Sequence, residues 1–444
     1  MLETTPFAAS LQEAVGGRML VHPLECRPFA IAGSPPKLVV SPASIEEAAL
    51  AAKLVALENE SLVVRGAGTK SWRPPAPGDV FAVMDMTRCD GVVAYEPGDL
   101  TVTVKAGTKL AHLQSVLSRH GQFFPCDAPF AAQATIGGTL AAGAGGALRL
   151  RFGSARDNTL GLRVALSDGT LAYSGSKVVK SVAGYDAYKL FIGSLGTLGV
   201  IGEATLKVAP LPAADGLLAA HFRSPRDAAA CALDIARSNL FVWAMSMHAA
   251  VAAARVGGLP DGKSAKTWLL LVRCGGSPAT VRRQIDGAAR LCKGRGALDM
   301  FEAPPHAVVK LCSRIAELAG GAAYPAGEFI VMKFSALPAH VAELADAALR
   351  VWPSAEISAH PALGIAYVHV PLERSSFRSE QLSALWSDLH RRECSVAVLA
   401  APPAISRDLR VPFSEAVPIE LQRRMKHALD PRGAFDPGRG AAGL

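Results

Sequence analysis

Short glycine-containing segments of the chain suit backbone contacts with an anionic ligand. The first is Arg65-Gly66-Ala67-Gly68-Thr69, which follows the apolar run Leu62-Val63-Val64 directly. Where a strand ends at glycines, no side chain shields the backbone N–H groups, and these can turn toward a phosphate. A plain β-turn is the competing interpretation of this segment taken alone.

The same segment matches the start of a dinucleotide-binding fingerprint, with Asp85 about twenty residues further on. That fingerprint needs a helix immediately after the glycines. Here Pro74, Pro75 and Pro77 follow instead, and proline lacks the N–H group and clashes with the preceding turn of a helix. The sequence therefore argues against a Rossmann-type NAD enzyme.

A second segment places a threonine before paired glycines. It reads Ala134-Thr135-Ile136-Gly137-Gly138-Thr139-Leu140 and is followed by Gly143, Gly145 and Gly146. Each glycine costs a helix roughly 1 kcal/mol. We therefore expect residues 128–146 to be an open loop whose backbone approaches a flat ligand or a pyrophosphate closely.

Three further segments read as loops when each is taken alone. They are Gly153 to Asn158, Lys177 to Asp186 continuing into Ile192 to Ile201, and the tail Lys426 to Arg439.

The pattern between these segments predicts helices and strands in both halves of the chain. Up to Pro212 we expect strands at 37–41, 62–65, 80–86, 100–105, 160–166, 170–174 and 199–208, and helices at 44–58, 108–120 and 187–192. Beyond Pro212, helices at 226–238, 278–292, 306–318, 338–351 and 380–392 alternate with strands at 240–247, 267–274, 328–334, 363–370 and 395–399. A last helix is expected at 419–429.

Composition excludes several classes of protein. The 444 residues are 50% apolar and 19% charged, which is typical of a globular chain of two or three domains. The net charge of +8 is spread along the chain and aromatic residues make up 6%, so a nucleic-acid surface is disfavoured. Eight cysteines without a CxxC pair indicate reduced thiols rather than a disulfide frame or an iron–sulfur site. No run is apolar enough to span a bilayer, and the N-terminus lacks a signal-peptide pattern.

In chain order, the glycine segments resemble the vanillyl-alcohol-oxidase / p-cresol-methylhydroxylase (PCMH) superfamily of flavoproteins. Residues 177–201 and the tail look like the FAD-binding E subunits of bacterial glycolate oxidases. This resemblance implies an α+β fold: a two-subdomain PCMH-type FAD-binding domain and an α+β cap with an antiparallel sheet. The expected organisation is an N-terminal arm (1–36), the FAD-binding domain (37–212), the cap (213–415) and a C-terminal segment (416–444) that returns to the flavin.

The resemblance also implies which residues hold FAD. The turn at Arg65, Gly66, Ala67, Gly68 and Thr69 would wrap the pyrophosphate together with Thr135, Ile136, Gly137 and Gly138, with Pro125 and Asp127 beside them. The flavin and ribityl chain would lie against Gly143, Gly145, Gly153 and Ser154, the adenine against Gly199 and Ile201, and the isoalloxazine ring near Asp436.

Two positions depart from that family. Covalent relatives carry a histidine where this chain has Thr69, so we expect dissociable, non-covalent FAD. Asp436 replaces the usual asparagine of the tail, and an acid beside the flavin would disfavour an anionic reduced ring. Arg65, Lys70 and Arg156 are the basic residues nearest the glycine segments, although an ordinary surface position is the simpler interpretation of Lys70 and Arg156.

The expected chemistry sets what the catalytic residues must do. Oxidation of a hydroxy acid needs a base for the hydroxyl proton and a cation for the carboxylate. Relatives that oxidise 2-hydroxy acids carry an HxGDGN metal segment, which this chain lacks, so we expect no metal. Tyr367 and His369 are candidates to face the flavin. His360 and His369 lie nine apart in what reads as one strand, which would point them to opposite faces.

The resemblance implies that this chain works in a complex. The partners would be a sister FAD subunit that oxidises the hydroxy acid and an iron–sulfur subunit, with the assembly cytoplasmic and peripheral at the inner membrane. Two alternatives stay open: a self-sufficient FAD-dependent dehydrogenase of another small hydroxy acid or alcohol, and a non-redox structural subunit.

Overall fold

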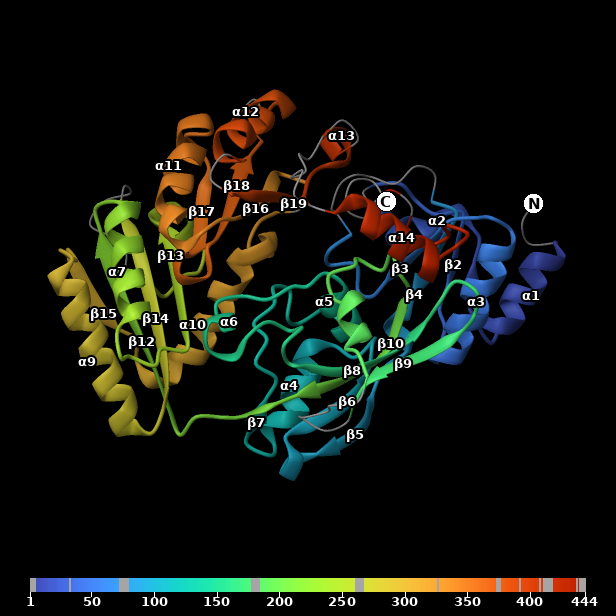
Figure 1. Cartoon of the computed structure of the whole chain (residues 1–444), viewed down its shortest axis with the longest axis horizontal. Coiled ribbons are helices and arrows are strands. Elements are labelled where there is room, and N and C mark those ends of the chain that lie inside the picture. Colours follow the sequence, from blue (N-terminus) through green and yellow to red (C-terminus); the bar gives the residue numbers. More distant parts are fainter. Residues whose placement is uncertain are drawn as a thin grey trace.

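The computed structural model describes residues 5–31, 33–71, 80–176, 184–259, 267–325, 327–372, 377–390, 393–406, 409, 418–436 and 438. Helices and mostly antiparallel sheets form two lobes (Figure 1). Residues of both lobes line a cleft between them. The α+β fold expected from the sequence is confirmed.

The first subdomain is a four-stranded sheet with helices packed against it. Strands β2 (Leu38–Val40), β4 (Ala82–Asp85) and β3 (Leu62–Arg65) are parallel, and β1 (Met19–Leu20) joins the edge beside β2 antiparallel to it. Helix α3 (Ile45–Leu57) begins where the Ser44 hydroxyl accepts a hydrogen bond from the Glu47 N–H. Helix α1 (Pro6–Ala14) packs against α3, and α2 (Pro23–Cys26) follows, so residues 5–31 belong to this core rather than to a separate arm.

The second subdomain is an antiparallel sheet of order β5-β6-β10-β8-β9. Its strands are β5 (Val92–Glu96), β6 (Thr101–Lys105), β8 (Thr159–Ala165), β9 (Leu171–Gly175) and β10 (Val200–Lys207). Helices α4 (Leu110–Ser118), α5 (Ile136–Ala141) and α6 (Arg149–Phe152) and the pair β7 (Gln122–Phe123) and β11 (Ala209–Pro210) complete it. The threonines that alternate with valines along β6, Thr101 and Thr103, are both buried, and the Thr103 hydroxyl pairs with that of Thr205 on β10.

The second lobe is built on an eight-stranded antiparallel sheet of order β15-β12-β14-β13-β17-β18-β16-β19. The strands are β12 (Ala214–Phe222), β13 (Ala244–Ala249), β14 (Trp268–Gly276), β15 (Asp299–Glu302), β16 (Phe329–Ser335), β17 (Glu356–His360), β18 (Ile365–Pro371) and β19 (Ser395–Ala400). Of these, β12, β15 and β17 were missed from sequence.

One face of this large sheet is covered by helices. Helices α7 (Pro225–Arg237), α9 (Pro278–Gly294), α11 (Val341–Val351) and α12 (Ser379–His390) enclose the largest apolar core there (Figure 1). On the other face, α8 (Ala250–Ala254) and α10 (Pro305–Leu318) cover part of the sheet. The β16-β18-β19 part of that face is left to form a wall of the cleft.

The C-terminal segment returns to the first lobe. After α13 (Pro403–Ser406), helix α14 (Ile419–Leu429) lies on the side of the first lobe (Figure 1), where Lys426 bonds to the Thr197 carbonyl, and Phe435 forms a parallel bridge with Leu62 of β3. The tail therefore pairs with the edge of β3 at its first residue, Leu62, at the end of the strand away from the first glycine segment.

Candidate functional site

The turn after β3 forms a cradle that side chains would fill. A methyl group on Gly66 would overlap the Thr135 hydroxyl, and one on Gly68, whose φ is +74°, would overlap the Arg65 guanidinium. The turn, Thr135, Gly138 and Leu195 enclose a small cavity of about 70 Å³. Glycine is required here because the two segments approach within contact distance of each other.

The backbone N–H groups of this turn lack hydrogen-bond acceptors among the described residues. In the part of the chain that the structure describes, no hydrogen bond uses the N–H groups of Gly66, Ala67, Gly68 or Thr69. Residues 66–69 are half-buried, and donors in such a position are satisfied by water or by a ligand when the protein does not satisfy them. Four unused donors in one turn that lines a cavity are suited to an anion.

Arg65 adds positive charge to the same place. Its Nη1 donates to the Pro28 carbonyl oxygen at 3.0 Å, and its guanidinium lies over the Phe29 ring. Its buried Nε has no hydrogen-bond partner among the described residues. Burial lowers the pKa of this guanidinium, although arginine stays charged at any ordinary pH. A phosphate oxygen would satisfy the unused Nε.

The second glycine segment differs from the expected open loop. Residues Ile136–Ala141 form the short helix α5, capped by the Thr135 hydroxyl, which accepts from the Gly138 N–H. The Ile136 and Gly137 N–H groups donate to the Thr108 and Ala106 carbonyls. The penalty for two helical glycines is offset because Gly137 lets the helix pack directly against Ala106. The N–H groups of Ile136, Gly137 and Gly138 therefore already have hydrogen-bond acceptors. This segment forms part of the cavity wall, but these three N–H groups are not free to bind a ligand.

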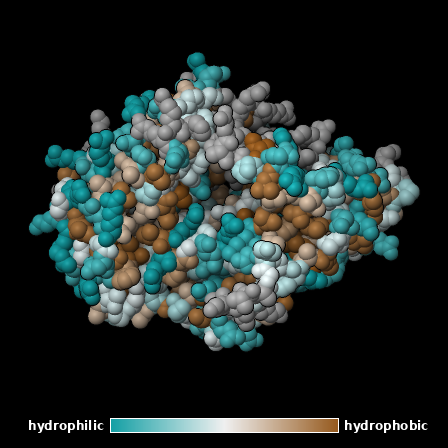
Figure 2. Space-filling model, in the orientation of Figure 1, coloured by the Kyte–Doolittle hydropathy of each residue, from teal (hydrophilic) through white to brown (hydrophobic). Residues whose placement is uncertain are grey.

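A larger cavity of about 400 Å³ continues from the small one into the cleft between the lobes. The two share Thr69, Lys70, Ala142 and Leu195, so they form one elongated space. Gly143 and Gly145 line its near side. The opposite wall is the open part of the second lobe's sheet. Figure 2 shows that the surface is hollowed between the two lobes.

Apolar groups dominate the walls of the larger cavity. Its polar side chains from the second lobe are Tyr324, Lys333, Ser335, Tyr367 and Ser395. Lys70 and Lys333 are its charged side chains in the described region, and no histidine or carboxylate there lines it. A flat, mostly apolar group with an anionic end fits an elongated space of this kind.

The other predicted site residues lie outside this space, and most have structural partners. Asp127 accepts from the Gly146 and Leu148 N–H groups, and Asp157 accepts from the Ser154 N–H and hydroxyl. Away from the two cavities lie Pro125, Asp127, Ile136, Gly137, Gly153, Ser154, Gly199, Ile201 and Asp436. Asp85, which the fingerprint comparison singled out, caps the turn at Thr87. Of the segment at 177–186, residues 177–183 lie outside the described residues, as do Pro437 and Arg439 of the tail.

The expectation that His360 and His369 point to opposite faces is wrong. They belong to two strands, β17 and β18, joined by a tight turn, and not to a single strand. The antiparallel register pairs Glu356 with His369 and Ser358 with Tyr367, which places both histidines on the same face of the sheet. Burial lowers the pKa of each to about 4, so both are neutral at pH 7.

Of the two candidate catalytic residues, Tyr367 lines the cavity and His369 does not. Tyr324 stacks on His369, with ring centroids 4.0 Å apart, and covers it on the cavity side. Burial raises the pKa of Tyr367, so its phenol stays protonated and serves as a hydrogen-bond group. Geometry thus favours Tyr367 over His369 for contact with a ligand.

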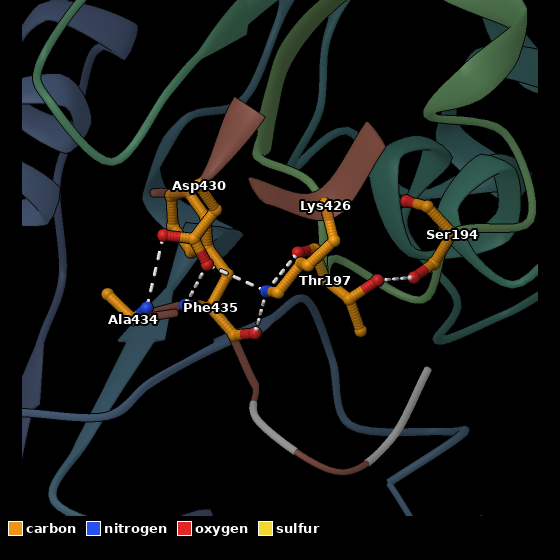
Figure 3. Close-up of polar contacts among 6 residues, drawn as sticks. All are labelled: Ser194, Thr197, Lys426, Asp430, Ala434 and Phe435. Atoms are coloured by element: carbon orange, nitrogen blue, oxygen red, sulfur yellow. Dashed lines mark hydrogen bonds and ion pairs between the residues drawn. The ribbon is translucent and has the colours of Figure 1, made fainter. Parts of the chain in front are cut away.

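The tail is fixed to the first lobe by one half-buried lysine. The Lys426 ammonium donates to the Thr197 and Phe435 carbonyls and to the Asp430 carboxylate at 2.6 to 2.7 Å (Figure 3). Asp430 in turn accepts from the Ala434 and Phe435 N–H groups. This cluster positions the strand-like segment that pairs with β3.

A second interlobe cavity of about 940 Å³ lies along α4, α9 and α10. Its prominent charged groups pair with each other: Arg273 makes a bidentate contact with Asp215, and Arg282 pairs with Glu302. It does not share the turn at 65–70.

Sequence reasoning missed several residues of the site. Lys333 and Tyr324 were not singled out, Leu195 was noted only as part of the segment 192–201, and Lys70 was interpreted as a surface cation. Phe329, Val331, Lys333 and Ser335 alternate along β16, which is visible in the sequence. Alternation identifies a face of a strand but not which other lobe covers it.

The comparisons with known proteins agree with this geometry. A family model described as "FAD binding domain" matches residues 36–173. This range contains β2 to β8, the start of β9 and both glycine segments of the cleft. The chain therefore carries an FAD-binding domain, and its unused amides and Arg65 suit the diphosphate of that cofactor.

Curated relatives match part of the chain. Glycolate oxidase subunit GlcE of Escherichia coli is 39% identical over 34% of this chain and 43% of its own length. D-lactate dehydrogenase [cytochrome] 1, mitochondrial, of Saccharomyces cerevisiae is 34% identical over 48% of this chain and 36% of its own. Glycolate oxidase subunit GlcD of Bacillus subtilis is 29% identical over 60% and 57%. The chain thus spans about a third to just over half of these relatives' lengths.

Solved structures share the fold along nearly the whole chain. 4-Ethylphenol oxidase from Gulosibacter chungangensis has a TM-score of 0.77 and 14% identity, covering 97% of this chain and 95% of that one. p-Cresol methylhydroxylase has a TM-score of 0.75 and 15% identity, covering 98% and 96%. The fold is therefore of the PCMH type. None of the described helices is long and apolar enough to cross a bilayer.

Proposed function

We propose that this chain is an FAD-bearing subunit of a 2-hydroxy-acid oxidase or dehydrogenase complex of the glycolate oxidase type. It would accept or relay electrons through non-covalently bound FAD. The observation that carries the proposal is the continuity of the anion cradle at 65–69 with the apolar cavity between the lobes. A diphosphate and a flat ring joined by a chain need a space of this shape.

Each part of the site has its own task. FAD, when bound, supplies the acceptor for a hydride or for electrons. The amides of residues 66–69 and Arg65 hold the diphosphate, and the apolar walls exclude water from the ring. Tyr367, which stays protonated, offers a hydrogen bond to a ring carbonyl or to a substrate hydroxyl. Thr69 stands where covalent relatives have a histidine, so the FAD is held without a covalent bond.

The similarity to two glycolate oxidase subunits supports a role within a complex. The cavity walls point the same way, because among the described side chains they hold two lysines and no histidine or carboxylate to accept a hydroxyl proton. We assign proton abstraction from the hydroxy acid to a sister FAD subunit. Electron transfer onward would use an iron–sulfur subunit, and docking would make the chain cytoplasmic and peripheral at the inner membrane.

A self-sufficient dehydrogenase is the second candidate, favoured by the similarity to D-lactate dehydrogenases and by Lys333 beside Tyr367 in the cavity. The two candidates differ in one experiment. The FAD-loaded chain is mixed anaerobically with glycolate, D-lactate and D-2-hydroxyglutarate, and flavin absorbance is followed. We expect no bleaching by the chain alone and bleaching after the sister subunit is added. Bleaching by the chain alone would establish the second candidate instead.

Relay through this chain's own FAD can be tested in the assembled complex. Gly66→Ala closes the cradle, whereas Gly98→Ala is a matched control because Gly98 has open space around its Cα. With the Gly66 variant, we expect substrate still to bleach the sister flavin, while transfer to a quinone falls at least about tenfold. An unchanged quinone rate with a cofactor-free Gly66 variant would show that this chain is a non-redox structural subunit.

A further inference from the structure

Lys70 occupies the junction of the two cavities. Its side chain lines both the small cavity at the glycine turn and the larger one between the lobes. The ammonium contacts the Thr69 hydroxyl at 3.2 Å and lies 5.9 Å from the centre of the Phe130 ring. In the described part of the chain it has no carboxylate within ion-pair distance.

A half-buried lysine without a carboxylate is uncommon, because an ammonium that leaves water needs compensation. The interpretation of Lys70 as an ordinary surface cation therefore does not fit its position. The side chain that follows the four unused amides of the turn points into the same space as those amides. Amides, Arg65 and Lys70 together make the junction strongly attractive to negative charge.

We propose that Lys70 is a cofactor-contacting residue whose ammonium forms an ion pair with an anionic group of FAD. Binding of FAD is then coupled to uptake of a proton by this side chain. This inference rests on the proposed FAD binding. To that proposal it adds Lys70 as a contact of the cofactor and a coupling between FAD binding and proton uptake.

The groups that face Lys70 make it the titrating group of the junction. Loss of hydration lowers the pKa of Lys70 to about 8. Burial raises the pKa of the Cys126 thiol to about 12, and burial also raises the pKa of Tyr324 and Tyr367, so these three stay neutral. The charged neighbours are Arg65 in the turn, Lys333 on β16 and Glu317 on α10, whose carboxylate is held by the Phe130 and Ala131 N–H groups.

The sign of the linkage follows from these charges. Without FAD, about half of the Lys70 side chains are neutral at pH 8, since that pH equals the pKa. A diphosphate or reduced ring next to the amine favours the ammonium form and raises its pKa. Binding at pH 8 then takes up about 0.5 proton per FAD, and at pH 6.5, where the side chain is already charged, almost none.

Titration calorimetry of the cofactor-free chain with FAD measures this directly. The apparent enthalpy is recorded at pH 8 and pH 6.5 in buffers of different ionisation enthalpy, and the slope gives the protons taken up. Lys70→Met removes the charge, while Lys70→Arg keeps it but cannot lose a proton in this range. Lys53→Met, at an exposed position on α3, is the matched control.

We expect uptake of about 0.5 proton in the wild type and in the Lys53 variant at pH 8, and none in either Lys70 variant. We also expect Lys70→Met to weaken FAD binding by about tenfold or more at pH 7, as loss of a charge-assisted contact does, with Lys70→Arg recovering most of it. Equal proton uptake in wild type and Lys70→Arg, or equal affinity of Lys70→Met, would overturn the proposal. Absence of FAD binding by the wild type would refute the proposed function itself. Circular dichroism of each cofactor-free variant confirms that it is folded.

Discussion

Replacing Lys426 with methionine should release the C-terminal tail from the FAD-binding lobe. The ammonium of Lys426, whose side chain is 14% exposed, makes three hydrogen bonds, one of them to the fully buried Asp430 carboxylate. Methionine keeps the aliphatic volume and removes the charge. The Asp430 carboxylate would then lie buried without a counter-charge.

The expected loss can be bounded from these contacts. Removing one partner of a buried ion pair costs about 3–5 kcal/mol. Asp430 keeps two backbone N–H donors, from Ala434 and Phe435, which compensate part of its charge. We therefore expect a loss of about 2–4 kcal/mol, confined to the tail and the edge of β3.

Native-state hydrogen exchange is the appropriate assay because it resolves the tail from the rest of the chain. The Leu62 and Asp436 N–H groups bond across the tail-to-β3 contact, so their exchange should accelerate by about thirty- to a thousandfold. Arg423→Met on the same helix is the matched control, since Arg423 is 60% exposed and its ion pair with Glu420 is long. It should change exchange by less than about threefold. Wild-type protection of both amides in the Lys426 variant would refute the argument that this lysine holds the tail.

Three further changes test the site and the cap. Gly66→Ala should weaken FAD binding at least about tenfold in an equilibrium titration, with Gly98→Ala unchanged, because only the former overlaps a neighbour; equal affinities would remove the turn from the site. Acid precipitation of the FAD-loaded chain should leave the flavin in the supernatant, since Thr69 offers no covalent link; yellow precipitate would contradict this. The cap should lose stability as pH falls from 6.5 to 5, by roughly 2 kcal/mol per buried histidine. In the unfolded state His369 takes up a proton over this range, whereas in the folded state its pKa is lowered to about 4 and it stays neutral. Urea unfolding should show a weaker pH dependence in His369→Gln, and an unchanged slope would count against this histidine.

The backbone framework was predictable where local signals are strong. Ser44 with Glu47 marked the start of α3, and the last helix was predicted at its observed bounds. The turn at 65–69 was recognised because glycines after an apolar strand are hard to explain otherwise. The cap strands β12 and β17 were missed: β12 follows Pro212 within an alanine-rich run, and β17 lies so close to β18 that the two read as one.

The parts of the site that escaped prediction depend on contacts distant in sequence. The Ile136 and Gly137 N–H groups donate to the Thr108 and Ala106 carbonyls, and the Thr135 hydroxyl caps the segment, so the expected loop is a short helix. Lys70 differs from a surface lysine only because the second lobe and Phe130 cover it. Neither fact has a local signature, since each depends on which lobe packs against the turn.

The bridge between Phe435 and Leu62 ties the maturation of the protein to the order in which the chain is made. The strand that ends in the cofactor turn emerges from the ribosome early, but among the described residues its outer edge is paired, at Leu62, by residues synthesised some 370 positions later. In a nascent chain, the strand that carries the cofactor turn therefore lacks this pairing until residue 436 has been released. Binding of the flavin nucleotide is then a late event of biogenesis. A tag fused close behind the tail would interfere with flavin binding more than with folding of the cap.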